Sequence, residues 1–312
     1  MLDATSKAFF HLLARSHALK RLASKYGMRS PESFARRFVP GEAIEDAIHA
    51  ARALDARGLT ATFDHLGENV TSLEEAAAAT RDHVDIVRAV IEAGVSRNIS
   101  VKLSQLGVDI DRDAAVGNLR DILSTTEREG FFVRIDMESS HYTAMTLDIF
   151  ELLWREGHRQ IGVVLQSDLY RSEEDMRRIS ALGARIRLVK GAYQEPRTVA
   201  YQKKSDVDAS YARMMKALLT DGTYPAIATH DPVMIDAARR WARAHGVTSD
   251  RFEFQMLYGI RRDLQSSLVH EGYRVRVYVP FGREWFPYFM RRLGERPANV
   301  AFVARGIVTE GH

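Results

Sequence analysis

The stretch 162–189, GVVLQSDLYRSEEDMRRISALGARIRLV, contains the repeating unit of this sequence. It begins with the apolar, β-rich run Gly162–Leu165, continues through the helix-like segment Ser172–Leu182 and ends in a second β-rich run, Ile186–Val189. Two short strands separated by a helix and its loops are typical of a parallel βαβ unit, because antiparallel neighbours need only a tight turn. The stretch therefore predicts the α/β fold class.

The same alternation extends over most of the chain. Further β-rich runs are Leu59–Phe63, Ile99–Leu103, Phe131–Ile135, Ala226–Ala228, Phe252–Phe254 and Val275–Val279. Helical patterns separate and follow them, at Leu73–Ala93, Ala114–Arg128, Thr146–Glu156, Asp206–Leu219, Pro232–His245, Arg261–His270 and Arg283–Gly294. Repeated βα units of this number and length predict a (βα)8 TIM-type barrel rather than an open doubly wound sheet.

No composition shift or Pro/Gly/Ser-rich linker divides the chain, which indicates a single domain. We expect residues 1–57 to form an N-terminal helical extension and residues 58–312 to form the barrel catalytic domain. The last helical pattern, which follows the eighth strand, is expected to carry a substrate clamp.

Composition is that of an ordinary soluble globular protein, with 46% hydrophobic and 27% charged residues. No apolar run reaches the roughly 18 residues of a membrane helix and no secretory leader is visible, so we expect a cytoplasmic protein. A net charge of +3 is too small to indicate a nucleic-acid partner. The absence of Cys excludes disulfides, thiolate metal sites and cysteine nucleophiles.

The first forty residues are basic and amphipathic, with eight Lys or Arg against Asp3 and Glu32. The favoured interpretation is a helix packed on the domain with its basic side chains in solvent. The alternative is peripheral contact with the anionic surface of the inner membrane.

Polar side chains follow nearly every predicted strand. In a (βα)8 barrel, catalytic residues lie where strands end and βα loops begin. One such residue could simply face solvent, but a ring of them indicates a site. The ring consists of Asp64, Lys102, Asp136, Gln166, Arg187, Lys190, Thr229, His230, Gln255 and Tyr278.

Several known motifs are missing from the sequence. There is no G-x-G-x-x-G after the first strand and no Walker loop, which excludes Rossmann and P-loop sites. No H-E-x-x-H or G-x-S-x-G occurs, so we expect neither a metal nor a nucleophile elbow. What remains is a site rich in cations with few acids, Asp136 and Glu295, which suits an anionic ligand or a small carboxylate beside a cofactor with phosphates.

The segment 274–299, RVRVYVPFGREWFPYFMRRLGERPAN, joins the eighth strand to the last helix. Its paired Arg291 and Arg292 could form a carboxylate clamp, since a guanidinium offers two parallel hydrogen bonds to a carboxylate. By themselves, two surface charges would be the simpler explanation. The residues alone leave the chemistry open.

Eight motifs in order carry a resemblance to a known family. They are SVKLSQLG (100–107), RIDME (134–138), VLQSDLYR (164–171), RIRLVKGAYQE (185–195), ATHDP (228–232), FEFQMLYGIRRDLQ (252–265), RVRVYVPFG (274–282) and Y-x-x-R-R-x-x-E (288–295). From about residue 35 onward the chain resembles proline dehydrogenase, and most of all the short, monofunctional bacterial enzymes. It departs from them at Asp168, where those enzymes more often carry an aromatic residue.

The resemblance implies an FAD-dependent barrel that oxidises L-proline to Δ1-pyrroline-5-carboxylate, with hydride transfer to the flavin N5. Electrons would then pass to a membrane quinone, as the first step of proline catabolism to glutamate. The product is expected to pass to a separate pyrroline-5-carboxylate dehydrogenase. Alternatives are a hydroxyproline-oxidising enzyme, another flavin-dependent barrel reductase such as a folate reductase, and a binding protein without cofactor. The bulk of Tyr278 favours proline over hydroxyproline.

The resemblance also implies residue roles. Asp136 and Arg187 are the expected catalytic residues, with Arg187 near the flavin. The substrate residues are expected to be Lys102, Arg291 and Arg292 at the carboxylate and Tyr278, Leu188 and Tyr193 around the ring. The FAD residues are expected to be Met137, Gln166, Arg187, Lys190, Gly191, Ala192, Thr229, His230, Gln255 and Glu295.

Overall fold

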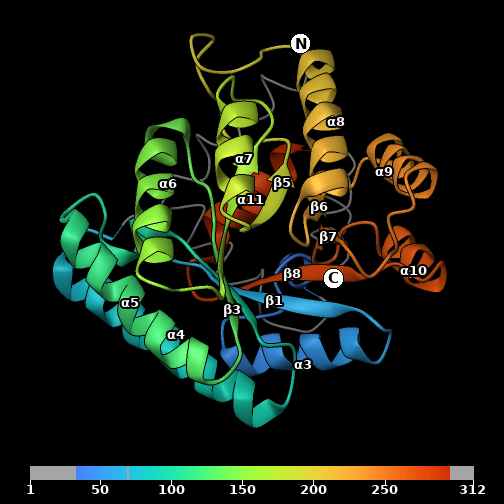
Figure 1. Ribbon diagram of the computed structural model, residues 1–312. Helices are drawn as coiled ribbons and strands as arrows, with labels where there is room; N and C mark the ends of the chain where they lie inside the picture. Colours follow the sequence, from blue (N-terminus) through green and yellow to red (C-terminus); the bar gives the residue numbers. More distant parts are fainter. Residues whose placement is uncertain (1–32, 69, 296–312) are drawn as a thin grey trace.

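The computed structural model describes residues 33–68 and 70–295, and in them the predicted barrel is confirmed. Eight parallel strands pair in sequence order, and β8 pairs with β1 to close the barrel (Figure 1). The strands are β1 (Thr60–His65), β2 (Asn98–Val101), β3 (Phe132–Ile135), β4 (Ile161–Gln166), β5 (Arg185–Val189), β6 (Ala226–Ala228), β7 (Glu253–Leu257) and β8 (Val275–Phe281).

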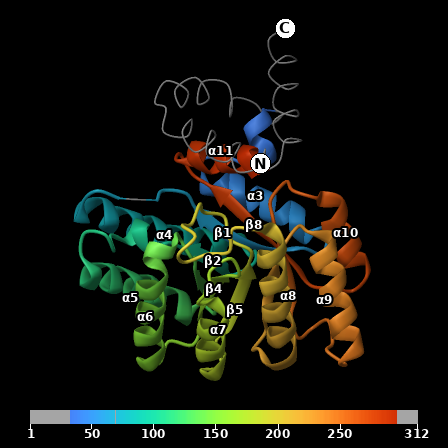
Figure 2. The ribbon, with the colours of Figure 1, turned by 90° about the horizontal axis from the view of Figure 1, so that it is seen from above.

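Each strand is followed by a helix, and all of these helices except α11 surround the strands (Figures 1 and 2). They are α4 (Leu73–Ala93), α5 (Arg112–Arg128), α6 (Ser140–Arg155), α7 (Ser172–Ala181), α8 (Lys204–Asp221), α9 (Pro232–Ala244), α10 (Arg262–His270) and α11 (Trp285–Glu295). A 3₁₀ turn, η2 (Leu103–Leu106), lies between β2 and α5.

Several helices begin where the sequence offers a capping side chain. Ser72 accepts a hydrogen bond from the Glu75 amide at the start of α4, and Asp111 accepts two at the start of α5. Such side chains satisfy amides that have no partner within the helix. Asp231 caps α9, and Pro232 follows at a position where its missing N–H costs nothing.

Helix α6 differs from the prediction because it begins at Ser140 instead of Thr146. Its first turns bury Thr143 and Thr146 rather than large apolar side chains. An apolar periodicity therefore starts too late to reveal the beginning of this helix.

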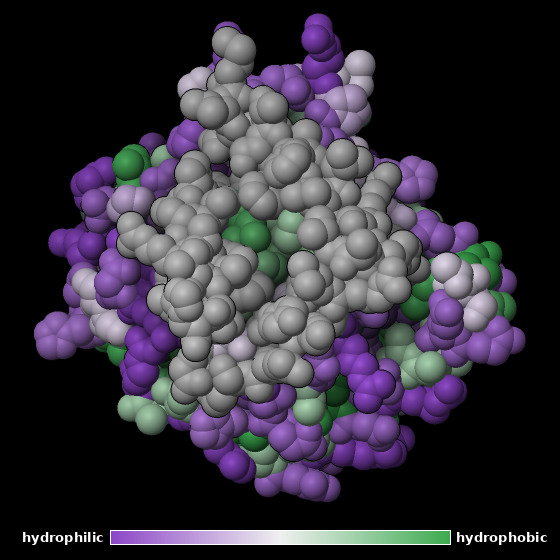
Figure 3. All heavy atoms as spheres, turned by 180° about the vertical axis from the view of Figure 1, so that it is seen from behind, coloured by the Kyte–Doolittle hydropathy of each residue, from purple (hydrophilic) through white to green (hydrophobic). Residues whose placement is uncertain are grey.

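The main apolar core lies between the strands and the surrounding helices, whereas the barrel interior is polar. Adjacent residues of a strand point to opposite faces, so Ile135 faces the helices while Arg134 faces the interior. Arg187 of β5 reaches Asp136 after β3, a hydrogen bond that crosses the barrel. The polar strand ends therefore converge. Among the residues coloured in Figure 3, which shows one outer face, hydrophilic ones predominate and hydrophobic ones form small, separate groups.

Among the described residues, two elements precede the barrel, η1 (Phe34–Arg37) and α3 (Ile44–Asp55). Helix α3 packs against β1 and β8. The rest of the predicted extension, residues 1–32 with most of the basic amphipathic segment, lies outside the described residues. Within the described ranges, no helix is long and apolar enough to cross a membrane.

A second apolar cluster fixes α11 over the barrel. It joins residues after η1, such as Phe38 and Val39, to Trp285 and Phe289 of α11. The Trp285 indole also donates to Glu42 at 3.0 Å. Helix α11 is thus packed on one face, which leaves its other face directed at the cavity described below.

Candidate active site

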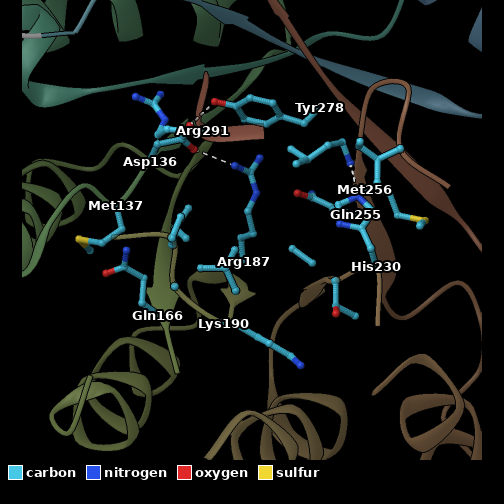
Figure 4. A pocket seen from close by; sticks show the side chains of 18 of the residues that line it. Asp136, Met137, Gln166, Arg187, Lys190, His230, Gln255, Met256, Tyr278 and Arg291 are labelled. Carbon is cyan, nitrogen blue, oxygen red and sulfur yellow. Dashed lines mark hydrogen bonds and ion pairs between the residues drawn. The ribbon is translucent and has the colours of Figure 1, made fainter. Parts of the chain in front are cut away.

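A cavity of about 500 Å³ lies where the strands end, within the size range of small-molecule sites. Side chains from the barrel interior meet residues of α11 and of the loop after β5 around it (Figure 4). Most of the residues predicted from the sequence line this cavity. They are Lys102, Asp136, Met137, Gln166, Arg187, Lys190, Gly191, Ala192, Tyr193, Thr229, His230, Gln255, Tyr278, Arg291 and Arg292.

Of the other two predicted residues, one lies elsewhere and the side chain of the second is not described. Leu188 is fully buried in the core between strands and helices, and it does not line the cavity. Its neighbours Arg187 and Val189 do line it, and alternation along β5 turns Leu188 to the opposite face. The assignment of Leu188 to the substrate pocket is therefore corrected. The side chain of Glu295, at the end of α11, lies outside the described part of the structure.

Lys102, directly after β2, is held by oxygens from three other strands. Its Nζ lies 2.6 Å from Asp64 Oδ1, 3.3 Å from the Tyr278 hydroxyl and 3.6 Å from Asp136 Oδ2. Lys102, Asp64 and Asp136 are all buried. The ammonium therefore occupies a fixed position in the barrel wall.

Asp136 is the centre of this network. Its Oδ1 accepts from Arg187 at 2.7 Å, and its Oδ2 accepts from the Tyr278 hydroxyl at 2.7 Å (Figure 4). Arg187 also donates to Ser100 at 3.3 Å, and its guanidinium lies 5.4 Å from the centre of the Tyr278 ring. One carboxylate thus orients a cation and a phenol from two other strands.

The charge states follow from burial and from these partners. Burial by itself lowers the pKa of Lys102, but Asp64, Asp136 and Glu68 together raise it above its ordinary value. Burial and the neighbouring carboxylates raise the pKa of Tyr278. Near neutral pH, Lys102 is therefore a cation and Tyr278 a neutral donor.

Helix α11 also contributes to the wall of this cavity, through Tyr288, Arg291 and Arg292. Arg291 donates two hydrogen bonds to Glu68, at 2.9 and 3.4 Å, from α11 to the loop after β1. Arg292 is buried and its guanidinium lies 5.1 Å from the centre of the Tyr288 ring. Glu68 was not among the residues predicted from the sequence, because it lies in a βα loop rather than at a strand end.

A different cation group lies at the end of β5. Lys190 pairs with Asp208 of α8 and, at 2.7 Å, with Asp231 at the start of α9. Lys204 contacts the same two carboxylates. Burial raises the pKa of both aspartates, but hydrogen bonds from the lysines outweigh it, so both pKa values lie below the ordinary range.

His230 has a defined tautomer. Its Nε2 accepts a hydrogen bond from the Leu257 amide at 2.9 Å. An imidazole nitrogen that accepts carries no proton, so the ring proton of neutral His230 is on Nδ1.

The prediction of few acids near the cations is wrong. Six cations line the cavity, namely Lys102, Arg187, Lys190, Lys204, Arg291 and Arg292. Four carboxylates line it with them, namely Asp64, Glu68, Asp136 and Asp231. Burial explains the difference, because unpaired cations in a partly closed site cost far more than paired ones. The cavity nevertheless keeps an excess of positive charge. Among the described residues, no group of acids and histidines could hold a metal ion.

Comparisons with known proteins identify the family of this chain. Residues 47–305 match the family model described as proline dehydrogenase. Proline dehydrogenase 2 of Bacillus subtilis (strain 168) is 42% identical over 302 residues, which are 97% of this chain and 98% of that protein. The proline dehydrogenase of Deinococcus radiodurans is 45% identical over 280 residues, 88% of this chain and 90% of that protein.

A solved structure shares the fold. It is the proline utilization A (PutA) protein of Bdellovibrio bacteriovorus inactivated by N-propargylglycine, with a TM-score of 0.78 and 27% identity. The match covers 83% of this chain but 32% of that longer chain. The barrel described above is therefore similar to one part of the larger protein.

Proposed function

Since the chain belongs to the proline dehydrogenase family, we propose that it oxidises L-proline to Δ1-pyrroline-5-carboxylate with FAD as the hydride acceptor. One observation carries this proposal. Three cations suited to a carboxylate (Lys102, Arg291 and Arg292) line the same cavity as Arg187 and the loop after β5. A small amino acid and a larger cofactor would thus bind next to each other in this cavity.

The residues present fit FAD. Gly191 lines the cavity with a φ of +124°, and an added Cβ there would lie 1.9 Å from Asp168 Oδ2. Only glycine fits this position, and a ligand can approach its backbone closely because no side chain intervenes. Gln166 Oε1 is buried in the cavity wall without a hydrogen-bond partner, which suits an N–H donor of a ligand. Lys190 and Lys204 supply cations suited to phosphates.

We assign to FAD the residues on this side, namely Met137, Gln166, Arg187, Lys190, Gly191, Ala192, Thr229, His230 and Gln255, and we keep Glu295 as a proposed contact. Bound FAD supplies hydride acceptance, and the protein binds, orients and tunes it.

The chain's own residues would fix the substrate. Arg291 and Arg292 would hold the proline carboxylate, each with a fork of donors, and Lys102 would add a charge from the barrel wall. Tyr278 would form the wall beside the ring, and Asp136 would keep both Tyr278 and Arg187 in position. Holding the reacting carbon in one place supplies the proximity part of catalysis.

The charge of the cavity would also favour the reactive form of the substrate. Proline must lose its ammonium proton before the adjacent carbon can give up a hydride. Six cations against four carboxylates around the cavity disfavour a further positive charge. The neutral amine is therefore the form that this site should bind best.

Other parts of the proposal rest on the family. We propose a membrane quinone as electron acceptor and a separate pyrroline-5-carboxylate dehydrogenase as the consumer of the product. We also propose a cytoplasmic protein in which residues 1–57 precede a barrel domain formed by residues 58–312. Peripheral contact through the basic segment would be consistent with a quinone acceptor.

Anaerobic titration of the purified protein with L-proline tests the proposal. We expect proline to bleach the flavin absorbance, and trans-4-hydroxyproline to do so much less, because Tyr278 is held in place by Lys102 and Asp136. Bleaching by NADH but not by proline would indicate a different flavin-dependent reductase. A colourless protein that does not bind added FAD would favour a binding protein.

A further inference from the structure

The loop from Lys190 to Lys203 joins β5 to α8 and forms part of the cavity wall through Gly191, Ala192 and Tyr193. It is drawn in yellow between α6 and α8 in Figure 2. The second half of this loop is fastened by its backbone to the turn after β4. Tyr201 N donates to Asp168 O at 2.8 Å, and Tyr170 N donates to Val199 O at 3.0 Å.

The first half of the loop is fastened through the backbone at its first residue, where Asp168 N donates to Lys190 O at 2.9 Å, and further along by a side chain. Glu195 Oε1 accepts from the Ser140 amide at 2.8 Å, and its Oε2 accepts from the Ser140 hydroxyl. Gln202 in turn donates to the Glu195 carbonyl at 3.2 Å. Glu195 therefore ties the segment that carries Tyr193 to the first residue of α6.

Helix α6 lacks a local cap at this point. Ser139 occupies its N-cap position but makes no side-chain capping bond, and its first turn contains no acid. Amides at a helix start need acceptors, and a negative charge there is favourable to the helix dipole. Glu195, 55 residues further along the chain, supplies both.

Tyr193 is the cavity residue nearest in sequence to this contact. It lies two residues before Glu195 and lines the cavity together with Arg291 and Glu68. We propose that Glu195 is a positioning residue, which by capping α6 holds Tyr193 against the substrate end of the cavity and so sets the affinity for the amino-acid substrate. The inference rests on the proposed function, because it assigns the substrate to that end.

The two hydrogen bonds predict a graded series of variants. Glu195→Ala removes both acceptors and the charge, and we expect the KM for proline to rise about tenfold with a smaller change in kcat. Ser140→Ala removes only the hydroxyl, for which we expect about a threefold rise. Glu195→Gln should restore most of the affinity, since its carbonyl can accept from the Ser140 amide while its NH₂ donates to the hydroxyl.

A double-mutant cycle distinguishes positioning from general damage. If Glu195 acts through Tyr193, Glu195→Ala should change KM little in a Tyr193→Ala background. Glu174→Ala, at an exposed glutamate of α7, is the matched control and should leave KM unchanged. A wild-type KM in Glu195→Ala would overturn the proposal. So would an equal rise in KM on Glu195→Ala in the wild-type and Tyr193→Ala backgrounds.

Amide hydrogen exchange provides a readout that needs no substrate. We expect faster exchange at residues 191–195 and in the first turn of α6 in Glu195→Ala, but not in Glu195→Gln. Unchanged exchange in Glu195→Ala would overturn the capping role. Because this measurement does not depend on proline, it tests the contact between Glu195 and α6 even if the protein does not oxidise proline. Failure to oxidise proline would instead overturn the proposed function.

Discussion

Lys102 and Arg291 face the same end of the cavity but are held in different ways. Lys102 follows a strand, is buried, and lies near oxygens from β1, β3 and β8. Arg291 lies on a helix above the barrel and pairs with a single carboxylate from a loop. We therefore distinguish a barrel half of the site (Lys102, Asp64, Asp136, Arg187 and Tyr278) from a rim half (Arg291, Glu68, Tyr193 and Glu195).

The difference shows how one site can combine rigidity with access. In the barrel half, each group restrains several others, so removal of one leaves buried charges without partners. In the rim half, contacts are pairwise, and the side chains of Arg291 and Glu68 are more exposed, at 17% each, so that this contact can be exchanged for one with a ligand. Changes in the barrel half should thus act mainly on stability, and changes in the rim half mainly on substrate affinity.

Lys102→Met should have the largest effect. It leaves the buried carboxylates of Asp64 and Asp136 without their shared cation, which should lower the free energy of unfolding by about 3–5 kcal/mol. Urea unfolding followed by circular dichroism measures this loss. Lys204→Met is the control, since the Lys204 side chain is 73% exposed and an exposed pair contributes about 0–1 kcal/mol. Equal losses in both variants would remove the distinction between the halves.

His83 supports the barrel half from outside. It is buried on α4, with its ring 6.0 Å from that of His65, which follows Asp64. Burial lowers its pKa from 6.5 to about 4. The unfolded chain therefore binds more protons than the folded one between these values, so stability is full above pH 6.5 and falls as the pH decreases toward 4.

The expected loss of unfolding free energy over that range is about 3 kcal/mol, because a tenfold change in a proton-binding constant corresponds to about 1.4 kcal/mol. Unfolding experiments at several pH values measure it. In His83→Gln this part of the pH dependence should disappear, while His49→Gln, at an exposed position of α3, should retain it. The same slope in all three proteins would show that another group is responsible.

Tyr278→Phe should have an intermediate effect. The change removes the hydroxyl that donates to Asp136 at 2.7 Å and lies 3.3 Å from Lys102. Loss of a buried hydrogen bond to a charged group should cost about 2 kcal/mol in the free energy of unfolding. Tyr142→Phe is the control, because its hydroxyl donates to Asp109 at an exposed position. A cost below that of the control would contradict a barrel half in which every group restrains its neighbours.

The barrel half and the rim half also differ in how many of their residues could be identified from the sequence. The barrel half could be predicted, because strands recur at regular spacing and parallel strands end at one edge. Leu188 was assigned to the pocket by the family resemblance, but two adjacent residues of a strand, Arg187 and Leu188, cannot both face the interior. Glu68 and Asp208 could not be found in this way, since a loop residue and a helix residue follow no strand-end rule. Their pairing with Arg291 and Lys190 depends on packing between distant elements.

Arg291→Lys should have the smallest effect on stability but a clear effect on substrate binding. Lysine keeps the charge but cannot make two parallel hydrogen bonds to a carboxylate, whether that of Glu68 or that of proline. We expect the KM for proline to rise about tenfold, equivalent to about 1.4 kcal/mol, with FAD still bound. The free energy of unfolding should change by only about 1 kcal/mol, because the charge is kept and one hydrogen bond to Glu68 is lost.

Steady-state kinetics with L-proline and urea unfolding of the same preparation measure both quantities. Arg292→Lys should also raise the KM for proline. Arg261→Lys is the control: it loses a similar forked contact, to Asp263 on the exposed surface, and should leave KM unchanged. Unchanged KM in both clamp variants would show that the carboxylate lies elsewhere. A loss of stability in Arg291→Lys as large as in Lys102→Met would show that the rim is as tightly restrained as the barrel. Only a change in KM without that loss supports a rigid barrel half combined with an exchangeable rim.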